Sequence, residues 1–185
     1  MATHICPWWL GYLLANPLRS LIQDPARILG PHIRPGMTVL EPGPGMGFFT
    51  LELARQVGLN GHVIAVDLEP RMLQGLQRRA AKRRLLNRIE TRQARPDSMD
   101  VQDLAGTVDF VLAFAVVHEL PSPDTFFNEA ASALKPGGRL LLAEPAGHVR
   151  SALFEEELRS ATGVGLSLLE RPSIRRSHAA LFAKP

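Results

Sequence analysis

The chain contains 185 residues, of which 45% are hydrophobic and 21% charged, and its formal net charge is +3. Such values are typical of one ordinary globular domain with enough length for a real core. Its single cysteine, Cys6, excludes an internal disulfide framework and any metal site built from several cysteines.

Residues 1–35 precede the first expected strand and are interpreted as an N-terminal helical extension, with 36–185 as a single folded unit. Two pairs, Asn16-Pro17 and Asp24-Pro25, have the form of a helix N-cap followed by proline at the first helical position. They predict two short helices within this extension.

Aromatic side chains gather near the start of the extension, at Trp8, Trp9 and Tyr12. The segment is typical either of a lid over a ligand cleft or of an amphipathic piece that packs against a sheet, and both interpretations stay open. Pro7 and Arg19 interrupt its apolar run, and no basic leader region accompanies it. We therefore expect neither a membrane span nor a signal peptide, and a cytoplasmic location follows by default.

From residue 38 onward, strand and helix signals alternate along the chain. Short apolar runs bounded by turn residues predict strands, and apolar residues at spacings of three and four predict helices. The expected strands cover 38–41, 62–66, 89–94, 108–115, 139–143, 166–169 and 179–183. The expected helices cover 48–57, 70–86, 125–134 and 149–161, the third with Asp124 as its N-cap. This alternation predicts a doubly wound α/β sheet, with the last two strands as an antiparallel pair at its edge.

The most informative stretch joins the first strand to the first helix and reads VLEPGPGMG over 39–47. Gly43, Gly45 and Gly47 leave no room for a regular strand and bring bare backbone to the start of a helix, where a ligand can approach. The second strand closes on Asp67, twenty residues after Gly47. An acid at this spacing can accept hydrogen bonds from both hydroxyls of a ribose, so the pattern favours a cofactor that contains adenosine.

Two residues around the turn discriminate between cofactors. Glu41, just before the first glycine, would repel a pyrophosphate but suits a cationic ligand that carries an ammonium group. Phe48 stands where the dinucleotide fingerprint GxGxxG requires glycine, and the sequence contains no GxxxxGK[ST] phosphate loop. A sulfonium cofactor with an amino-acid tail therefore fits better than NAD or ATP.

Four sequence blocks carry a resemblance to a known enzyme family: VLEPGPGMGFFT, VIAVDLEP, VDFVLAFAVVHEL and LKPGGRLLLAEP. Through these blocks the chain resembles class I S-adenosylmethionine-dependent methyltransferases. It is close to the small-molecule type that includes the ubiquinone and menaquinone biosynthesis enzymes. The resemblance implies a Rossmann-like sheet of seven strands whose last strand is antiparallel.

The resemblance also implies a binding site for S-adenosyl-L-methionine, which leaves as S-adenosyl-L-homocysteine. Glu41, Gly43, Pro44, Gly45 and Gly47 are expected around the methionine part, Asp67 on the ribose, and Leu68 against adenine, with Phe114 as a further contact. The family usually places an acid next to adenine after the third strand, where this chain reads QARPD. Asp97, or backbone groups of Ala94 and Arg95, are the candidates for that contact.

The candidate catalytic residue is His118, which follows the fourth strand near the expected methyl position. Methyl transfer from a sulfonium is an in-line displacement, so a general base is needed only where the acceptor must lose a proton. His118 is interpreted as that base or as a contact to the cofactor, and its alternative role is to cap the loop. Glu119 is interpreted as structural, whereas Glu144 and His148, after the fifth strand, are further candidates for the acceptor pocket.

No metal site is expected. Cys6 is interpreted as a small buried hydrophobe, and arsenic-methylating relatives depend on several cysteines, which this chain lacks. The remaining histidines show no metal-ligand spacing: His32, His62 and His178.

Positive charge is concentrated between residues 71 and 95, where Glu90 is the one acid. The nine cations there are Arg71, Arg78, Arg79, Lys82, Arg83, Arg84, Arg88, Arg92 and Arg95. The cluster is interpreted as the solvated face of a helix, with binding of RNA, DNA or an anionic surface as the alternative. No aromatic residue interleaves with it, as a stacking surface for single strands would require.

The sequence thus predicts an S-adenosylmethionine-dependent methyltransferase that acts on a small-molecule acceptor. An RNA methyltransferase or RNA-binding protein that uses the basic cluster is one alternative. A catalytically silent regulatory protein that binds the cofactor is another.

Overall fold

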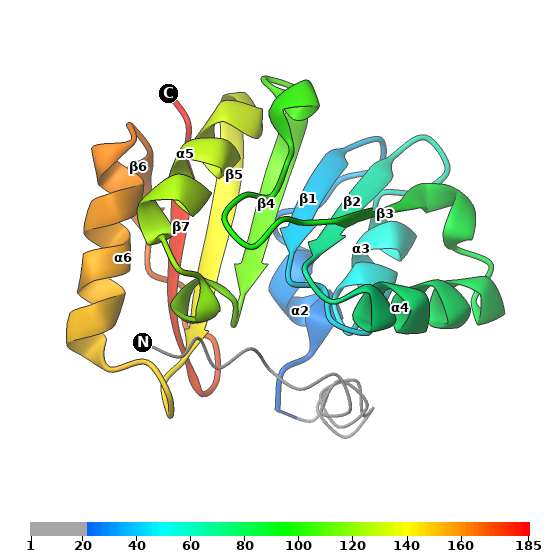
Figure 1. Cartoon of the computed structure of the whole chain (residues 1–185), viewed down its shortest axis with the longest axis horizontal. Coiled ribbons are helices and arrows are strands. Elements are labelled where there is room, and N and C mark those ends of the chain that lie inside the picture. The colour runs from blue at the N-terminus through cyan, green and yellow to red at the C-terminus, as the bar shows by residue number, and fades with distance from the viewer. Residues whose placement is uncertain (1–21) are drawn as a thin grey trace. The chain divides into compact units, whose positions relative to one another are not determined.

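The computed structural model describes residues 22–185, which form two compact units, 22–94 and 95–185 (Figure 1). The helix expected after Asn16 and the aromatic segment with Trp8, Trp9 and Tyr12 lie outside the described residues. The expected boundary between an extension and a folded unit at residue 35 stays a prediction.

The strands of the described residues form one seven-stranded sheet in the order β3-β2-β1-β4-β5-β7-β6. They are β1 (Thr38–Pro42), β2 (His62–Asp67), β3 (Ile89–Gln93), β4 (Val108–Phe114), β5 (Leu134–Pro145), β6 (Ser167–Glu170) and β7 (Ser177–Ala183). Strand β2 pairs in parallel with β1 and β3, and β4 pairs in parallel with β5. Strand β7 runs antiparallel to both β5 and β6. The predicted α/β sheet with an antiparallel last strand is confirmed.

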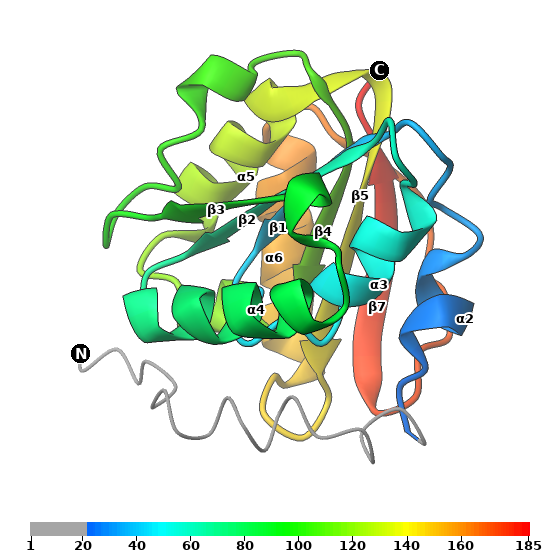
Figure 2. The same ribbon diagram turned by 90° about the vertical axis from the view of Figure 1, so that its right-hand side faces the viewer.

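The unit 22–94 carries three α-helices and a 3-10 turn: α2 (Pro25–Leu29), α3 (Thr50–Gln56), α4 (Pro70–Lys82) and η2 (Leu86–Arg88). Asp24 caps α2 as predicted, since its carboxylate accepts from the amides of Ala26 and Arg27. Helix α4 packs against β2 and β3 (Figure 2). It buries Met72, Leu76 and Ala80, whose spacing of four places them on one face of the helix.

Helix α4 ends at Lys82, four residues before the predicted end. The chain leaves the helix at Arg84, which has a φ of 58°. A left-handed backbone cannot continue a right-handed helix, and a non-glycine residue adopts it only at some cost. The expected helix to residue 86 was therefore too long.

The unit 95–185 carries η3 (Gln102–Leu104), η4 (Val117–Glu119), α5 (Pro123–Ala133) and α6 (Ser151–Gly163). The N-cap of α5 is Ser122, whose hydroxyl accepts from the amide of Thr125 at 3.2 Å. The expected cap, Asp124, lies inside the first turn, where its charge suits the positive end of the helix. The prediction of Asp124 as the cap was wrong because Ser122 and Pro123 already provide the cap and the first helical position.

Strand β5 is longer than the predicted 139–143, because it begins at Leu134 and includes Pro136-Gly137-Gly138. Gly137 has a φ of 77°, and its amide donates to the carbonyl of Lys184 at 2.8 Å. The glycines thus form an irregular start of the strand that still pairs with the chain end. At the sheet edge, β6 exposes Leu168 and Leu169 and has a register shift between Leu168 and Glu170.

The core follows the central strands: β1, β2 and β4 are buried along most of their length, whereas β3 is mostly half-buried and β6 is exposed. Val39 and Leu40 of β1, and Val111 and Leu112 of β4, have no exposed surface. Continuous burial of this kind is typical of parallel strands that are covered on both faces. Within residues 22–185, no helix has the length and apolar character needed to cross a membrane.

Candidate functional site

The three glycines that follow β1 all have a left-handed backbone, with φ values of 64° at Gly43, 53° at Gly45 and 83° at Gly47. Only glycine adopts this conformation without steric cost. A Cβ on Gly47 would lie 2.4 Å from Cδ1 of Leu76, so this glycine lets the turn pack against α4. A Cβ on Gly45 would meet nothing within 4 Å, so the backbone of Gly45 borders open space.

Asp67 connects this turn to the end of β2 within the same unit. Its Oδ2 accepts from the amide of Gly45 at 3.2 Å, and its Oδ1 accepts from the amide of Glu69 at 2.9 Å. The backbone oxygen of Asp67 accepts from the amide of Ala94 at 3.0 Å. The structure therefore brings together three parts of the predicted donor site: the glycine turn, the ribose acid, and the chain after β3.

Glu41 lies at the end of β1 with only 4% of its surface exposed. Its Oε2 has no hydrogen-bond partner among the described residues. Burial raises the pKa of the Glu41 carboxyl to about 8. The hydroxyl of Thr50 opposes the rise, and the nearby charge of Asp67 adds to it. A buried acid with a free oxygen is costly unless a partner satisfies it. The ammonium group of an amino-acid tail would satisfy it, so the residues present fit the expected cofactor.

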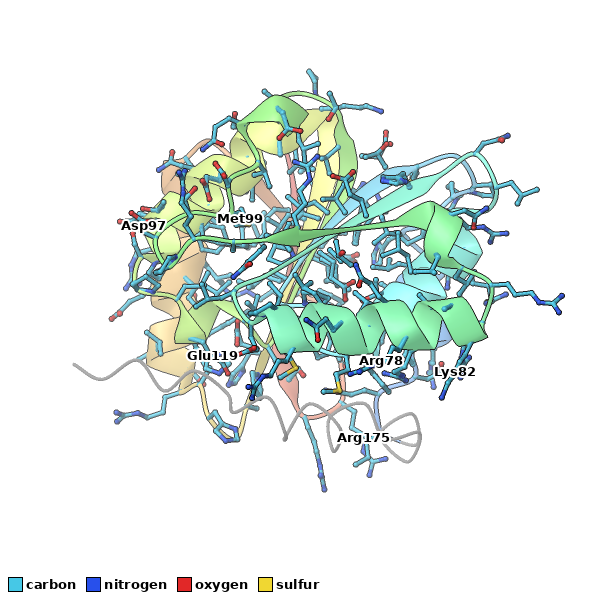
Figure 3. The ribbon with its side chains drawn as sticks, turned by 45° about the vertical axis from the view of Figure 1, so that its right-hand side comes forward. Arg78, Lys82, Asp97, Met99, Glu119 and Arg175 are labelled. Atoms are coloured by element: carbon cyan, nitrogen blue, oxygen red, sulfur yellow. The ribbon has the colours of Figure 1, made fainter. Side chains whose placement is uncertain are left out.

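Of the candidates for the adenine contact, Asp97 is exposed to solvent (Figure 3). It lies in a tight turn in which the amide of Arg95 donates to the carbonyl of Ser98 at 2.9 Å. The guanidinium of Arg95 points instead to Asp100, 3.0 Å away. Ala94 is half-buried, and its amide donates the hydrogen bond to Asp67 described above. Leu68, the residue after Asp67, is also half-buried.

The unit 95–185 contains a second buried polar cluster, centred on Glu144 at the end of β5. Glu144 has no exposed surface, and its Oε1 accepts from the amides of Val116 at 3.2 Å and Val117 at 2.8 Å. Its Oε2 bonds to Nδ1 of His118. The φ of Ala115 is 56°, a strained value that turns the chain sharply after β4 and directs both amides to one oxygen.

Glu144 and a further acid, Glu157 of α6, control the charge of this cluster. The hydrogen bond from Glu144 raises the pKa of His118, although burial works in the opposite direction. Glu157 is 2% exposed, and neither of its carboxylate oxygens has a hydrogen-bond partner in the described chain. Burial and the charge of Glu144 raise the pKa of Glu157 to about 8.

The residues of the buried polar cluster around Glu144 differ from those that the sequence predicted for the acceptor pocket. Glu144 belongs to β5 itself and bonds to His118, whereas His148 lies exposed on the following loop. Phe114 is buried at the end of β4. Glu157 was not predicted, although a signal existed: it occupies an apolar-face position of α6, between the buried Phe154 and Ala161.

The basic cluster of residues 71–95 is partly neutralised within the protein. Arg92 pairs with Glu90 at 2.6 Å, and the guanidinium groups of Arg79 and Arg88 donate to carbonyls of Met46 and Ala54. Four cations are exposed, and their side chains make no hydrogen bond or ion pair to the described residues. We call them the cationic face: Arg78, Lys82, Arg83 and Arg84. Arg78 and Lys82 lie along α4 (Figure 3).

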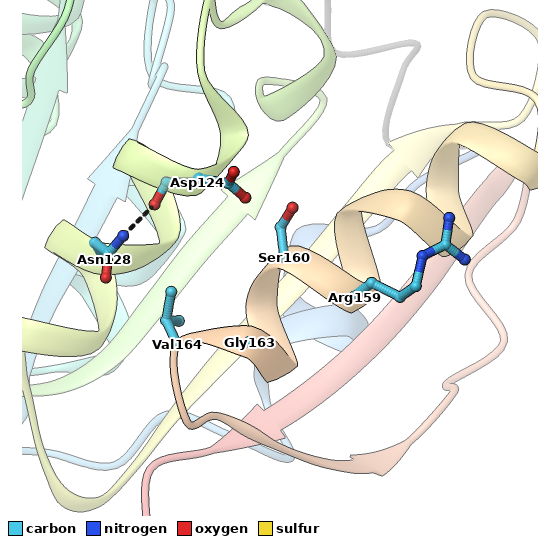
Figure 4. Close-up of a pocket in the computed structure, with 6 residues that line it drawn as sticks. All are labelled: Asp124, Asn128, Arg159, Ser160, Gly163 and Val164. Carbon is cyan, nitrogen blue, oxygen red and sulfur yellow. Dashed lines mark hydrogen bonds between the residues drawn. The ribbon is translucent and has the colours of Figure 1, made fainter.

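A separate hollow lies between α5 and α6 (Figure 4). It is lined by Asp124, Asn128, Arg159, Ser160, Gly163 and Val164. The side-chain amide of Asn128 donates to the carbonyl of Asp124 at 2.9 Å, one turn earlier in the same helix. The residues that line the hollow include no buried acid with a raised pKa, such as Glu41 or Glu157. Among residues 22–185 there is also no group of three or more potential ligands that could hold a metal ion.

Comparisons with known proteins agree with this geometry. Residues 33–165 match the sequence profile of a family described as a methyltransferase domain. Over 125 residues the chain is 33% identical to an arsenite methyltransferase of Halobacterium salinarum, covering 68% of this chain and 30% of that protein. It is also 31% identical over 116 residues to the ubiquinone/menaquinone biosynthesis C-methyltransferase UbiE of Brucella suis, covering 63% and 42%. The chain spans less than half the length of these curated relatives.

A solved structure shows the same fold over nearly the whole chain. It is a SAM dependent methyltransferase from Aquifex aeolicus, with a TM-score of 0.83, 24% sequence identity, and coverage of 97% of this chain and 98% of that chain. The profile match spans well over half of the sequence, on a sheet with the strand order described above. The chain therefore belongs to the class I S-adenosylmethionine-dependent methyltransferases, with S-adenosylmethionine as their cofactor.

Proposed function

We propose that the chain transfers the methyl group of S-adenosylmethionine to a small-molecule acceptor by in-line displacement. The observation that carries this proposal is Glu41, a buried carboxyl with an unsatisfied oxygen next to a glycine turn that borders open space. This combination suits a cationic ligand with an ammonium group. It does not suit a pyrophosphate.

On the donor side, the residues of the chain bind and orient. Glu41 pairs with the ammonium group, the backbone of Gly43, Pro44, Gly45 and Gly47 borders the methionine part, and Asp67 accepts from the ribose hydroxyls. Leu68 contacts adenine, and Ala94, Arg95 and Phe114 are the further proposed contacts. When bound, the cofactor supplies a methyl group that its positive sulfur already activates.

The protein's contribution to the rate is mainly positional. Holding two reactants close and aligned can supply about 7–11 kcal/mol of the barrier. His118 is the proposed catalytic residue, acting as general base where the acceptor carries a proton. The proposed reaction needs no further catalytic residue to activate the methyl donor.

The acceptor class rests on the similar proteins. One relative is named an arsenite methyltransferase, and others are named C-methyltransferases of ubiquinone and menaquinone biosynthesis. Both names describe small acceptors, which supports a small molecule here. The cytoplasmic location predicted from the sequence stays part of this proposal, and cell fractionation tests it.

Calorimetry with S-adenosylmethionine and S-adenosylhomocysteine tests the donor site. The proposal predicts binding, and Asp67→Ala should weaken it by about 1–3 kcal/mol because a charged hydrogen bond to the ribose is lost. Glu52→Gln is the matched control, since Glu52 pairs with Arg55 on α3 and not with the site. Absence of binding by the wild type at millimolar ligand would overturn the proposal.

Transfer of a labelled methyl group into cell extract, separated by molecular size, tests the acceptor. The proposal predicts label in the small-molecule fraction. Label in RNA would favour the nucleic-acid alternative. Cofactor binding without any transfer of label would favour the silent regulatory protein.

A further inference from the structure

The glycine turn between β1 and α3 is bonded through several of its backbone groups. The amide of Gly43 donates to a backbone carbonyl of β2 at 2.8 Å, and the amide of Gly45 donates to Asp67, as described above. The amide of Gly47 closes the turn on itself, because it donates to the carbonyl of Pro44 at 2.9 Å. Strand β2 therefore holds the first part of the turn, up to Gly45.

Helix α4 holds the last part of the turn. Leu76 packs against Gly47, as described above. Gly75 lets the side chain of Met46 lie against the helix, because an added Cβ on Gly75 would be 3.0 Å from Cγ of Met46. One turn further along the helix, Nη1 of Arg79 donates to the carbonyl of Met46 at 2.5 Å. One face of α4 thus contacts two adjacent residues of the turn.

The hydrogen bond from Arg79 fixes one peptide group. The carbonyl of Met46 and the amide of Gly47 belong to the same planar peptide. Arg79 bonds to the oxygen of this peptide, and its N–H bonds to the carbonyl of Pro44, so both ends are held. A bond from a guanidinium is stronger than a neutral one, and bonds in a chain strengthen one another. Because Gly47 has no Cβ, the peptide beside it has several accessible orientations, and Arg79 selects one of them.

Arg79 differs from the cations around it. It is half-buried, whereas Arg78 and Lys82 of the same helix are exposed. Burial and the nearby charge of Arg83 lower the pKa of Arg79, so the position is less favourable for a cation than bulk water. The hydrogen bond to the turn compensates for that cost. A solvated helix face would not need such a contact.

The same helix begins beside the proposed ribose acid. Asp67 accepts from the amide of Glu69, as described above, and the carboxylate of Glu69 caps α4 by accepting from the amide of Arg71 at 3.0 Å. Helix α4 is therefore attached to Asp67 at its start and to the turn through Arg79. The spacing between the two parts of the proposed donor site depends on this helix.

We propose that Arg79 is a positioning residue for the methyl donor: it holds the peptide between Met46 and Gly47 so that the open backbone at Gly45 is already oriented for the methionine part of the cofactor. This inference rests on the proposed function and adds to its donor site a residue from outside the four sequence blocks. A backbone that is ordered in advance binds more tightly, because the ligand does not have to order it. Arg79 acts through the turn.

Calorimetry on the full chain with two ligands tests the inference. S-adenosylhomocysteine carries the amino-acid tail, and adenosine lacks it. Arg79→Gln should weaken binding of S-adenosylhomocysteine roughly 10-fold, near the lower end for a lost hydrogen bond to a charged group, and should leave binding of adenosine unchanged. Arg79→Lys should recover part of the loss, because an ammonium group can still donate to the carbonyl of Met46.

Arg88→Gln is the matched control. Arg88 is also half-buried, and its Nη1 also donates to a backbone carbonyl, that of Ala54 in α3, at 3.2 Å. The control should lose stability as Arg79→Gln does, yet bind both ligands as the wild type does. Hydrogen exchange of the Gly47 amide, followed by NMR in the free protein, should become faster in Arg79→Gln and stay unchanged in Arg88→Gln.

The outcomes separate this inference from the proposed function. Wild-type affinity for S-adenosylhomocysteine in a folded Arg79→Gln, or an equal loss of affinity for both ligands, would overturn the inference and leave the proposed function intact. If Arg79→Gln does not fold, Arg79→Lys decides by the same comparison, with a smaller loss expected for S-adenosylhomocysteine alone. A wild type that binds neither ligand would instead overturn the proposed function, and the inference with it.

Discussion

At the scale of single residues, the two units each bury one acid that has an oxygen without a partner. Glu41 ends β1 and Glu157 lies on the buried face of α6. Both have a pKa raised to about 8, mainly by burial. A folded chain does not keep such groups for stability, because burying an acid is unfavourable unless it is protonated or paired. Each acid therefore lowers the stability of the folded chain unless it is protonated or paired.

Replacing Glu157 by glutamine should change how stability depends on pH. The folded pKa of about 8 is above the unfolded value of 4.5, so the folded state holds a proton that the unfolded state loses. The free energy of unfolding of the wild type should therefore fall as pH rises from about 4.5 to about 8. Glu157→Gln should remove this contribution, and urea unfolding across that pH range measures it.

Glu156→Gln is the control for this experiment, because Glu156 is the exposed neighbour of Glu157 on the same helix. Its variant should keep the slope of the wild type. Equal slopes in the wild type and Glu157→Gln would show that the buried acid does not take up a proton on folding.

Replacing Glu41 by glutamine should change the protons released on cofactor binding. Near neutral pH the free protein holds a proton on Glu41, and pairing with an ammonium group favours the ionised form, so binding should release that proton below about pH 8. Calorimetry in two buffers of different ionisation enthalpy measures the release. Glu41→Gln should abolish it and weaken binding by about 1.5–3 kcal/mol, the contribution of a hydrogen bond to a charged group.

The companion variant for Glu41 is again Glu52→Gln, which leaves the buried acid in place. It should release protons as the wild type does. A wild type that binds S-adenosylhomocysteine without any proton release near pH 7 would contradict the assigned role of Glu41.

At the scale of elements, the turn between β1 and α3 uses its glycines for different purposes. Gly47 brings the turn against α4, and Gly45 leaves the backbone open. Gly47→Ala should lower the free energy of unfolding more than Gly45→Ala, because the first adds a clash with Leu76 to the backbone strain of about 1–2 kcal/mol that both share. Chemical denaturation of the two variants measures the difference.

Cofactor affinity should separate the same two variants from a surface control. Gly45→Ala places a methyl group in the space that the ligand is proposed to enter, so it should weaken binding beyond its effect on stability. Gly147→Ala is the control, since nothing lies within 4 Å of an added Cβ and its φ is not left-handed. Wild-type affinity in a folded Gly45→Ala would place the ligand elsewhere.

The order of elements was predictable because periodicity and turn residues are local properties of the sequence. The residues at which the helices begin and end were less predictable. The sequence of α4 remains favourable to a helix beyond Lys82, and only the backbone of Arg84 ends it. The start of α5 depended on a competition between Ser122 and Asp124, both of which are good caps. Packing of the folded chain determines such helix ends, and a local sequence pattern carries no information about packing.

The contact between the glycine turn and Asp67 could be anticipated for a similar reason, since these residues lie close along the chain. Cofactor binding at this turn stays a prediction. The bond between His118 and Glu144 joins residues that are 26 positions apart. Glu157 enters the cluster from yet another element, and its role depends on burial that only the fold creates. The one indication in the sequence was that Glu157 is an acid at an otherwise apolar position of α6.

At the scale of the whole molecule, positive charge is concentrated on the cationic face defined above. Exposed cations without partners attract polyanions, and such binding weakens steeply with salt. In the nucleic-acid alternative, neutralising Arg78, Lys82, Arg83 and Arg84 together should abolish RNA binding at low salt. Methyl transfer to a small molecule should remain, and both are measured on one preparation, by filter binding and by labelled transfer.

Neutralising an equal number of cations elsewhere is the control: Arg27, Arg55, Arg150 and Arg159, all exposed. Their removal should weaken RNA binding less than removal of the cationic face. Loss of labelled transfer only in the cationic-face variant would make the acceptor a polyanion and contradict a small-molecule substrate.

The edge strand β6 has a consequence for how copies of this protein behave together. A sheet edge with free backbone groups is a template on which a strand from another copy can add, and exposed leucines favour that addition. In β6 the ladder is irregular between Leu168 and Glu170, immediately beside the exposed Leu169. An incoming strand cannot keep a continuous register across such a bulge. We therefore expect the irregular register to hinder the addition of further strands beside the two exposed leucines.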